Sequence, residues 1–196
     1  MLREAAEPPG VGYHLSLAPE TITPSSIETQ LEALRIELEE SARYHQRRGW
    51  FYGRLHSVTI LVGITLGWAA FVAGAGNATA ILGLVIAVAG ALSLVLYFSR
   101  RVEDHEKLLL RYDKLASEIQ MEEPTPEHLR RCAHQERQIA VGEPPTYWAL
   151  KAACYNEVLR ARGRNKHLYN ISLLPRLLMN FVKFDRDPAF RRIIGD

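Results

Sequence analysis

The chain has 196 residues, with 24 Lys and Arg against 22 Asp and Glu, so its formal net charge is only +2. None of these charged residues and none of the seven histidines falls within residues 57–99, an apolar run of 43 residues. The rest of the chain is too short to bury so long a run, which argues against a purely water-soluble globular protein.

The two ends of the chain carry opposite charge. Residues 1–42 have two basic and eight acidic side chains, a net charge of −6, whereas residues 160–196 have nine basic and three acidic side chains, a net charge of +6. A basic end is typical of contact with anionic lipid or with an acidic neighbour.

Residues 1–24, rich in Pro, Gly, Ala and Glu, predict a flexible leader, with no apolar run that would make it a signal peptide. A helix is expected to start at Ser25, because Ser25 and Glu28 have the spacing of a capping box. No proline follows before the apolar run, so residues 25–56 predict a cytoplasmic helix that leads into the membrane. Its apolar stripe consists of Ile27, Leu31, Leu34 and Leu38.

The run 57–99 predicts a transmembrane hairpin. About 20 apolar residues span a bilayer, so the run holds two spans, 57–73 and 78–99, joined by a turn at Gly74-Ala75-Gly76-Asn77. Arginines flank both spans on the side away from the turn, and positive residues stay in the cytoplasm, so both termini are expected inside. The predicted fold class is an all-α, multi-pass membrane protein whose hairpin extends into a helical cytoplasmic part.

Residues at the base of the hairpin match the membrane–water interface, where aromatic and basic side chains collect. We expect His45, His56 and His105, which flank the membrane, to be interfacial polar residues. The predicted interface anchors are Trp50, Tyr52, Arg54, Tyr97, Arg100 and Arg101.

Small residues recur along one face of each span, and such faces let helices approach closely in lipid. They pack the two helices of one hairpin or join separate copies, and the sequence leaves both interpretations open. These residues are Gly63, Gly67, Gly83, Ala87 and Gly90. The hairpin contains no ionisable residue, which argues against a transporter. Its polar side chains, the candidates for lining a pore, include Thr65, Asn77, Thr79 and Ser93.

Residues 100–163 predict a helical cytoplasmic part. The helix of the second span is expected to continue, because its apolar stripe extends through residues 108–119. Thr125 and Pro126 fit the N-cap and first position of another helix, and Gly163 fits the stop of a last helix over 146–162. The stripe in the first of these helices consists of Leu108, Tyr112, Leu115 and Ile119.

Residues 164–196 predict a basic amphipathic C-terminal segment. Within it, 168–184 has a narrow polar stripe and is interrupted by Pro175. The pattern fits a kinked helix that either lies on the inner membrane face or packs on the cytoplasmic helices.

The sequence contains no recognisable catalytic, cofactor-binding or metal-binding motif, so we expect a protein that is not an enzyme and needs no cofactor. His128 and Cys132 share a helix face, but a zinc site needs more ligands at paired spacing. Cys132 and Cys154 form no Cys-x-x-Cys motif, and we expect both to be reduced core residues.

The order of these parts resembles a known family. The helix enters the membrane through YHQRRGWFY at 44–52, the second span leads to Arg100-Arg101, and the motifs Tyr112-x-x-Leu115-x-x-Glu118, EPPTY at 143–147 and CYNE at 154–157 follow. Over residues 27–163 the chain resembles the SLATT family, bacterial two-transmembrane effector domains.

The resemblance implies a membrane effector of bacterial conflict and anti-phage systems. Such proteins are thought to oligomerise in the inner membrane and permeabilise it, causing growth arrest or cell death. It implies as partners the lipid bilayer, further copies of the chain, and a nucleotide-second-messenger system or another trigger protein, but not nucleic acid. The alternative is a membrane anchor or scaffold for a cytoplasmic partner, with no pore.

Overall fold

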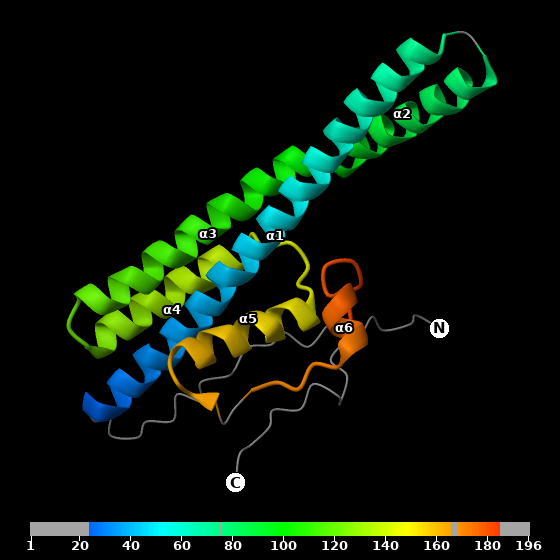
Figure 1. Ribbon diagram of the computed structural model, residues 1–196. Coiled ribbons are helices and arrows are strands. Elements are labelled where there is room, and N and C mark those ends of the chain that lie inside the picture. The colour runs from blue at the N-terminus through cyan, green and yellow to red at the C-terminus, as the bar shows by residue number, and fades with distance from the viewer. Residues whose placement is uncertain (1–23, 75, 166–167, 185–196) are drawn as a thin grey trace, which may run out of the picture.

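The computed structural model describes residues 24–74, 76–165 and 168–184, and this part of the chain is an all-helical assembly built on one long helix (Figure 1). That helix, α1 (Pro24–Ala73), has 50 residues. Its C-terminal half lies beside α2 (Asn77–Leu96), and its N-terminal half lies beside α3 (Phe98–Met121). Three shorter helices lie around the N-terminal half of α1: α4 (Pro126–Ala140), α5 (Trp148–Ala161) and α6 (Leu173–Leu178).

The continuity of α1 agrees with the absence of proline after its first turn. At 1.5 Å per residue the helix is about 75 Å long, far longer than the packed body of helices around its N-terminal half. The two halves of α1 therefore lie in different surroundings. One half of α1 has a packed side and charged sides, and the other half is apolar.

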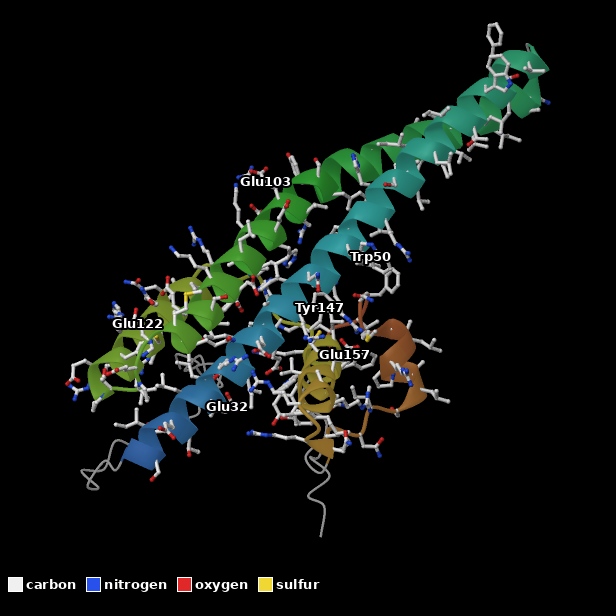
Figure 2. All side chains as sticks on the ribbon, turned by 60° about the vertical axis from the view of Figure 1, so that its left-hand side comes forward. Glu32, Trp50, Glu103, Glu122, Tyr147 and Glu157 are labelled. Carbon is white, nitrogen blue, oxygen red and sulfur yellow. The ribbon has the colours of Figure 1, made fainter. Side chains whose placement is uncertain are left out.

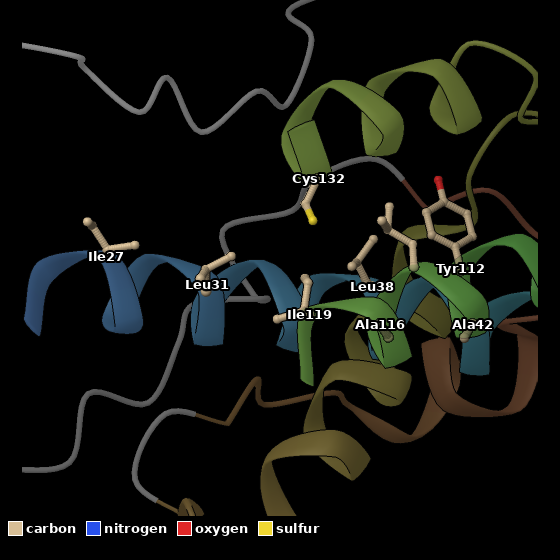
Figure 3. Packing of buried hydrophobic residues seen from close by; sticks show 9 residues of the cluster. Ile27, Leu31, Leu38, Ala42, Tyr112, Ala116, Ile119 and Cys132 are labelled. Carbon is tan, nitrogen blue, oxygen red and sulfur yellow. The ribbon is translucent and has the colours of Figure 1, made fainter. Parts of the chain in front are cut away.

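The predicted core stripes are confirmed (Figure 3). Residues Ile27, Leu31 and Leu38 of α1 pack against α3, and Cys132 of α4 closes the cluster, with Leu34 and Leu129 packed at its edge. Leu38 and Cys132 are 0% and 1% exposed. The contribution of α3 to this core consists of Tyr112, Leu115, Ala116 and Ile119.

The prediction that one helix runs from the second span into α3 is wrong, because a single residue, Tyr97, separates α2 from α3. Tyr97 adopts a left-handed conformation, with φ 46° and ψ 46°, between the end of α2 and the start of α3. This conformation costs a non-glycine residue about 1 kcal/mol, which helical continuity would have avoided. The break accompanies burial of Phe98, whose ring lies 6.4 Å from that of Tyr52, while the Tyr97 side chain stays exposed.

The helix boundaries after α3 follow local sequence chemistry. Thr125 is the N-cap of α4, where its hydroxyl accepts a hydrogen bond of 3.1 Å from the His128 amide, and Pro126 takes the first helical position. Gly163 has a φ of +70° just after α5, a conformation that glycine adopts at little cost. The thiols Cys132 and Cys154 are free and buried, as expected.

The C-terminal segment is less helical than the sequence pattern predicts. Only six residues, α6, are helical within 168–184. Pro175 falls in the first turn, where it is tolerated but prevents the helix from starting earlier. Upstream, the side chain of Asn156 hydrogen-bonds both the backbone N–H (2.7 Å) and the carbonyl (2.8 Å) of Tyr169, which holds this stretch in a non-helical conformation.

Removal of a core side chain should destabilise the body of helices far more than removal of an exposed one. We expect Leu38→Ala to lower the free energy of unfolding by about 2–5 kcal/mol, because it leaves a cavity in the α1–α3 interface. The matched control is Leu110→Ala on α3, where the leucine is 62% exposed. Urea titration in detergent, followed by circular dichroism, measures both. Equal losses in the two variants would contradict this packing.

Candidate functional site

The apolar half of α1 and the whole of α2 form a helix pair whose outer side chains are exposed (Figure 2). Within the described residues, α1 contains one stretch long and apolar enough to cross a membrane, and none of that stretch is buried. α2 carries a shorter apolar stretch, Asn77–Ala91. The most exposed side chains of the pair, each at least 64% exposed, are Leu61, Ile64, Trp68, Phe71, Val72, Ile81 and Leu84.

The glycines predicted for helix packing differ in whether they meet the neighbouring helix. Gly67 faces α2, because a Cβ at this position would lie 4.0 Å from Ile86 Cδ1. A Cβ added at Gly63, Gly83 or Gly90 would meet nothing within 4 Å. The small-residue stripe of α2, defined here as Gly83, Ala87 and Gly90, is exposed, and neither of its glycines has a neighbour within 4 Å of an added Cβ.

The candidate pore-lining residues are also dispersed. Thr65 and Asn77 are exposed, and the Thr65 hydroxyl donates a hydrogen bond to the Leu61 carbonyl of its own helix. The Thr79 hydroxyl donates to the Gly74 carbonyl and is half-buried. The Ser93 side chain lies outside the described residues. One copy of the chain therefore brings together no polar lining from these positions.

Five of the six predicted interface anchors are exposed at the base of the helix pair. The Arg54 guanidinium lies 3.4 Å from the centroid of the Trp50 ring, and Trp50 is 61% exposed. The exposed side chains after α2 are Tyr97, Arg100 and Arg101. The sixth residue, Tyr52, is not an exposed anchor as predicted. It is only 8% exposed, because its ring stacks on His105 with centroids 5.7 Å apart.

Below the base of the pair lies a buried polar cluster, defined as His45 and Arg48 of α1, His105 and Tyr112 of α3, and Glu143 from the α4–α5 loop. His45 is 1% exposed, and its Nδ1 lies 2.8 Å from Nδ1 of His105. Its Nε2 lies 3.1 Å from Oε1 of Glu143. The Tyr112 hydroxyl donates to the same carboxylate oxygen.

Burial and hydrogen bonding shift the pKa values of Glu143, His105 and Tyr112 in this cluster. Burial disfavours the charged form of Glu143, but the hydrogen bonds from His45 and Tyr112 outweigh it and lower the pKa of the carboxyl. The ionised Glu143 accepts a hydrogen bond from His45 Nε2–H, and in the contact between the two Nδ1 atoms one ring donates and the other accepts. Burial, together with the charges of His45 and Arg48, lowers the pKa of His105 to about 3. Tyr112 stays protonated because burial raises its pKa.

Arg48 joins this cluster to α5 and α6. It is 2% exposed, and its guanidinium lies 4.1 Å from the ring centroid of Tyr147 and 4.6 Å from that of Tyr52. It donates to the Asn180 carbonyl at 2.8 Å and to the Tyr52 hydroxyl. A buried guanidinium needs such partners, since an unpaired buried charge is strongly destabilising.

An open cleft of about 690 Å³ borders the cluster between α3 and the α4–α5 loop. Arg100, Arg101, Lys107 and Arg111 line it, but so do the carboxylates of Asp104 and Glu143. Lys107 is also paired with Glu103 at 2.6 Å. The cleft therefore has mixed charge.

His45 and His105 were expected at the membrane interface, and the structure corrects this by placing both in the core. A signal existed in the spacing. His45 lies seven residues after Leu38, and His105 lies three before Leu108 and seven before Tyr112, so both continue the apolar stripes of their helices. A polar residue in phase with a core stripe indicates a buried hydrogen-bonded position.

No group of three or more potential metal ligands occurs among the described side chains. Cys132, which shares a helix face with His128, packs in the core cluster. No known protein family, curated protein or solved structure matches the chain.

The low pKa of His105 predicts that stability falls on acidification. The unfolded chain titrates this histidine near 6.5 and the folded protein near 3, so between these values the unfolded state binds more protons. From pH 7 to pH 5 we expect a loss of about 2 kcal/mol in the free energy of unfolding from this residue.

His105→Gln should flatten that pH dependence, whereas His134→Gln, a change at an exposed histidine of α4, should leave it intact. Unfolding in urea at pH 5 and pH 7 measures the slopes. An unchanged slope in His105→Gln would contradict the burial of a neutral His105.

Proposed function

We propose that the chain is a two-span protein of the bacterial inner membrane, with both termini in the cytoplasm, and that its copies assemble and permeabilise that membrane. The observation that carries the proposal is the exposed apolar surface of α1 and α2. Side chains such as Ile64, Phe71 and Leu84 are 65–79% exposed on a helix pair that projects beyond the packed body. A soluble monomer rarely exposes so large an apolar surface, whereas lipid accommodates it.

The membrane orientation rests on charge. Arg54 precedes the apolar half of α1, Arg100 and Arg101 follow α2, and the turn between the helices has no charged residue. Basic residues remain on the cytoplasmic side, so the packed body of α3, α4 and α5 lies in the cytoplasm and the turn lies outside.

Assembly follows from the geometry of a single copy. Two helices enclose no water-filled path, so permeabilisation requires several copies around a common axis. The small-residue stripe of α2 is exposed, with no neighbour within 4 Å of a Cβ added at Gly83 or Gly90, and offers the close approach that helices use in lipid. Thr65, also exposed, is a polar side chain available to the interior of such an assembly.

The resemblance to SLATT proteins supplies the biological setting of this proposal, an effector that arrests or kills an infected cell. The alternative is a membrane anchor that holds a cytoplasmic partner on the body of α3, α4 and α5. The two differ in whether the membrane-embedded helices assemble.

Gly83→Leu should separate assembly from insertion. It adds bulk to the small-residue stripe of α2 but keeps the helix apolar, so we expect normal membrane insertion with loss of high-order oligomers and of toxicity on overexpression. Val88→Phe adds bulk at another exposed position of α2, and we expect it to retain both properties. Native mass measurement in detergent gives the oligomeric state, and a membrane-potential dye reports permeabilisation.

Full toxicity and assembly in Gly83→Leu would remove the small-residue stripe from the mechanism. A wild-type protein that inserts but stays monomeric and leaves the membrane potential intact would replace the pore proposal with the anchor.

A further inference from the structure

The segment around α6 has two unlike sides. Its inner side is fixed to the body: Met179 packs against the core cluster of Tyr44, Leu150 and Cys154, and the Asn180 carbonyl accepts a hydrogen bond from Arg48. Its outer side is apolar and uncovered. The exposed fractions are 76% for Leu173, 63% for Leu174, 75% for Leu177 and 64% for Phe181. We call these four residues the α6 apolar face.

The α6 apolar face lies beside α1, and the level at which it meets α1 suggests what covers it. The Phe181 ring packs edge-on against Phe51, with centroids 5.0 Å apart, and Phe51 lies six residues before the apolar run begins at Ser57. At 1.5 Å per residue this separation is about 9 Å along the axis, which places Phe51 at the outer boundary of a headgroup region about 5–8 Å deep.

The surroundings of the face match a membrane surface. Trp50, exposed and stacked with Arg54, lies next to Phe51 on α1, and Figure 2 shows it pointing outward on the side where α6 lies. Arg176 and Lys183, both exposed, accompany the apolar residues. Apolar side chains flanked by basic ones are the composition of segments that lie in the headgroup region of anionic membranes.

We infer that the α6 apolar face inserts into the cytoplasmic leaflet of the bilayer that α1 and α2 cross. This inference rests on the proposed function, because it requires the helix pair to be membrane-embedded. It adds a third lipid contact, made by a segment more than 70 residues after the end of α2 in the chain and fixed to α1 through Arg48 and Phe51.

Lipid quenching of a site-specific fluorophore tests the inference in the full-length protein. Single cysteines replace Leu177 on the α6 apolar face, Ile64 in the apolar half of α1, and Lys114 on the exposed surface of α3. The native cysteines, 1% and 0% exposed, are poorly accessible to the reagent. Each variant is labelled with a polarity-sensitive dye and reconstituted in vesicles of phosphatidylcholine and phosphatidylglycerol in equal parts, with or without lipid that carries a quencher near the headgroup.

We expect the probe at 177 to lose emission with the shallow quencher and to shift to the blue in vesicles, and the probe at 114 to show neither change. Leu173→Glu with Leu174→Glu should reverse the effect at 177, because charged side chains oppose insertion. A blue shift at 177 that persists without lipid quenching would mean that protein covers the face, and would overturn the inference.

The probe at 64, read with a quencher deep in the acyl chains, separates failure of the α6 inference from failure of the two-span proposal. Quenching at 64 without quenching at 177 overturns the inference and leaves the two-span proposal in place. An absence of quenching at both positions contradicts membrane insertion itself, and the inference falls with it.

Discussion

The structure depends on one side of α1. From Ile27 to Leu38 this side is apolar and packs on α3, at His45, Arg48 and Tyr52 it is polar or aromatic and buried, and at Gly67 it meets α2. Because α1 is one uninterrupted helix, these successive contacts share a single axis and a fixed rotational phase. Tyr97 interrupts the helix between α2 and α3, so their positions relative to each other follow from their contacts with α1.

The buried polar cluster adds directionality to this packing. Apolar side chains tolerate small shifts in register, but the His45–His105 contact, the shared Glu143 carboxylate and the stacking of Arg48 require particular partners at particular distances. Buried ionic groups contribute little net stability, since desolvation offsets their attraction. We therefore infer that the cluster fixes the register of α1, α3 and the α4–α5 loop directly below the apolar helix pair.

Much of the architecture could be predicted from periodicity and local chemistry. The stripes at 27–38 and 108–119, the Thr125 cap and the Gly163 stop follow from spacing and side-chain type, which act locally. The sequence could not place the small residues, because the phase of α2 against α1 depends on tertiary packing. The burial of Tyr52, the Tyr97 break and the shortening of the 168–184 helix by the Asn156 hydrogen bonds also depend on distant partners. The loop residue Glu143 had no periodic signal that linked it to either histidine.

The claim on which this account rests is that the chain crosses the membrane twice, with the packed body in the cytoplasm. A cysteine in place of Asn77, at the start of α2, tests it most directly, because the two native thiols are buried and react slowly. In intact spheroplasts an impermeant thiol reagent should label position 77, and should label a cysteine in place of Lys114, an exposed residue of α3, only after lysis. Labelling at 114 without lysis, or protection at 77, would contradict the account.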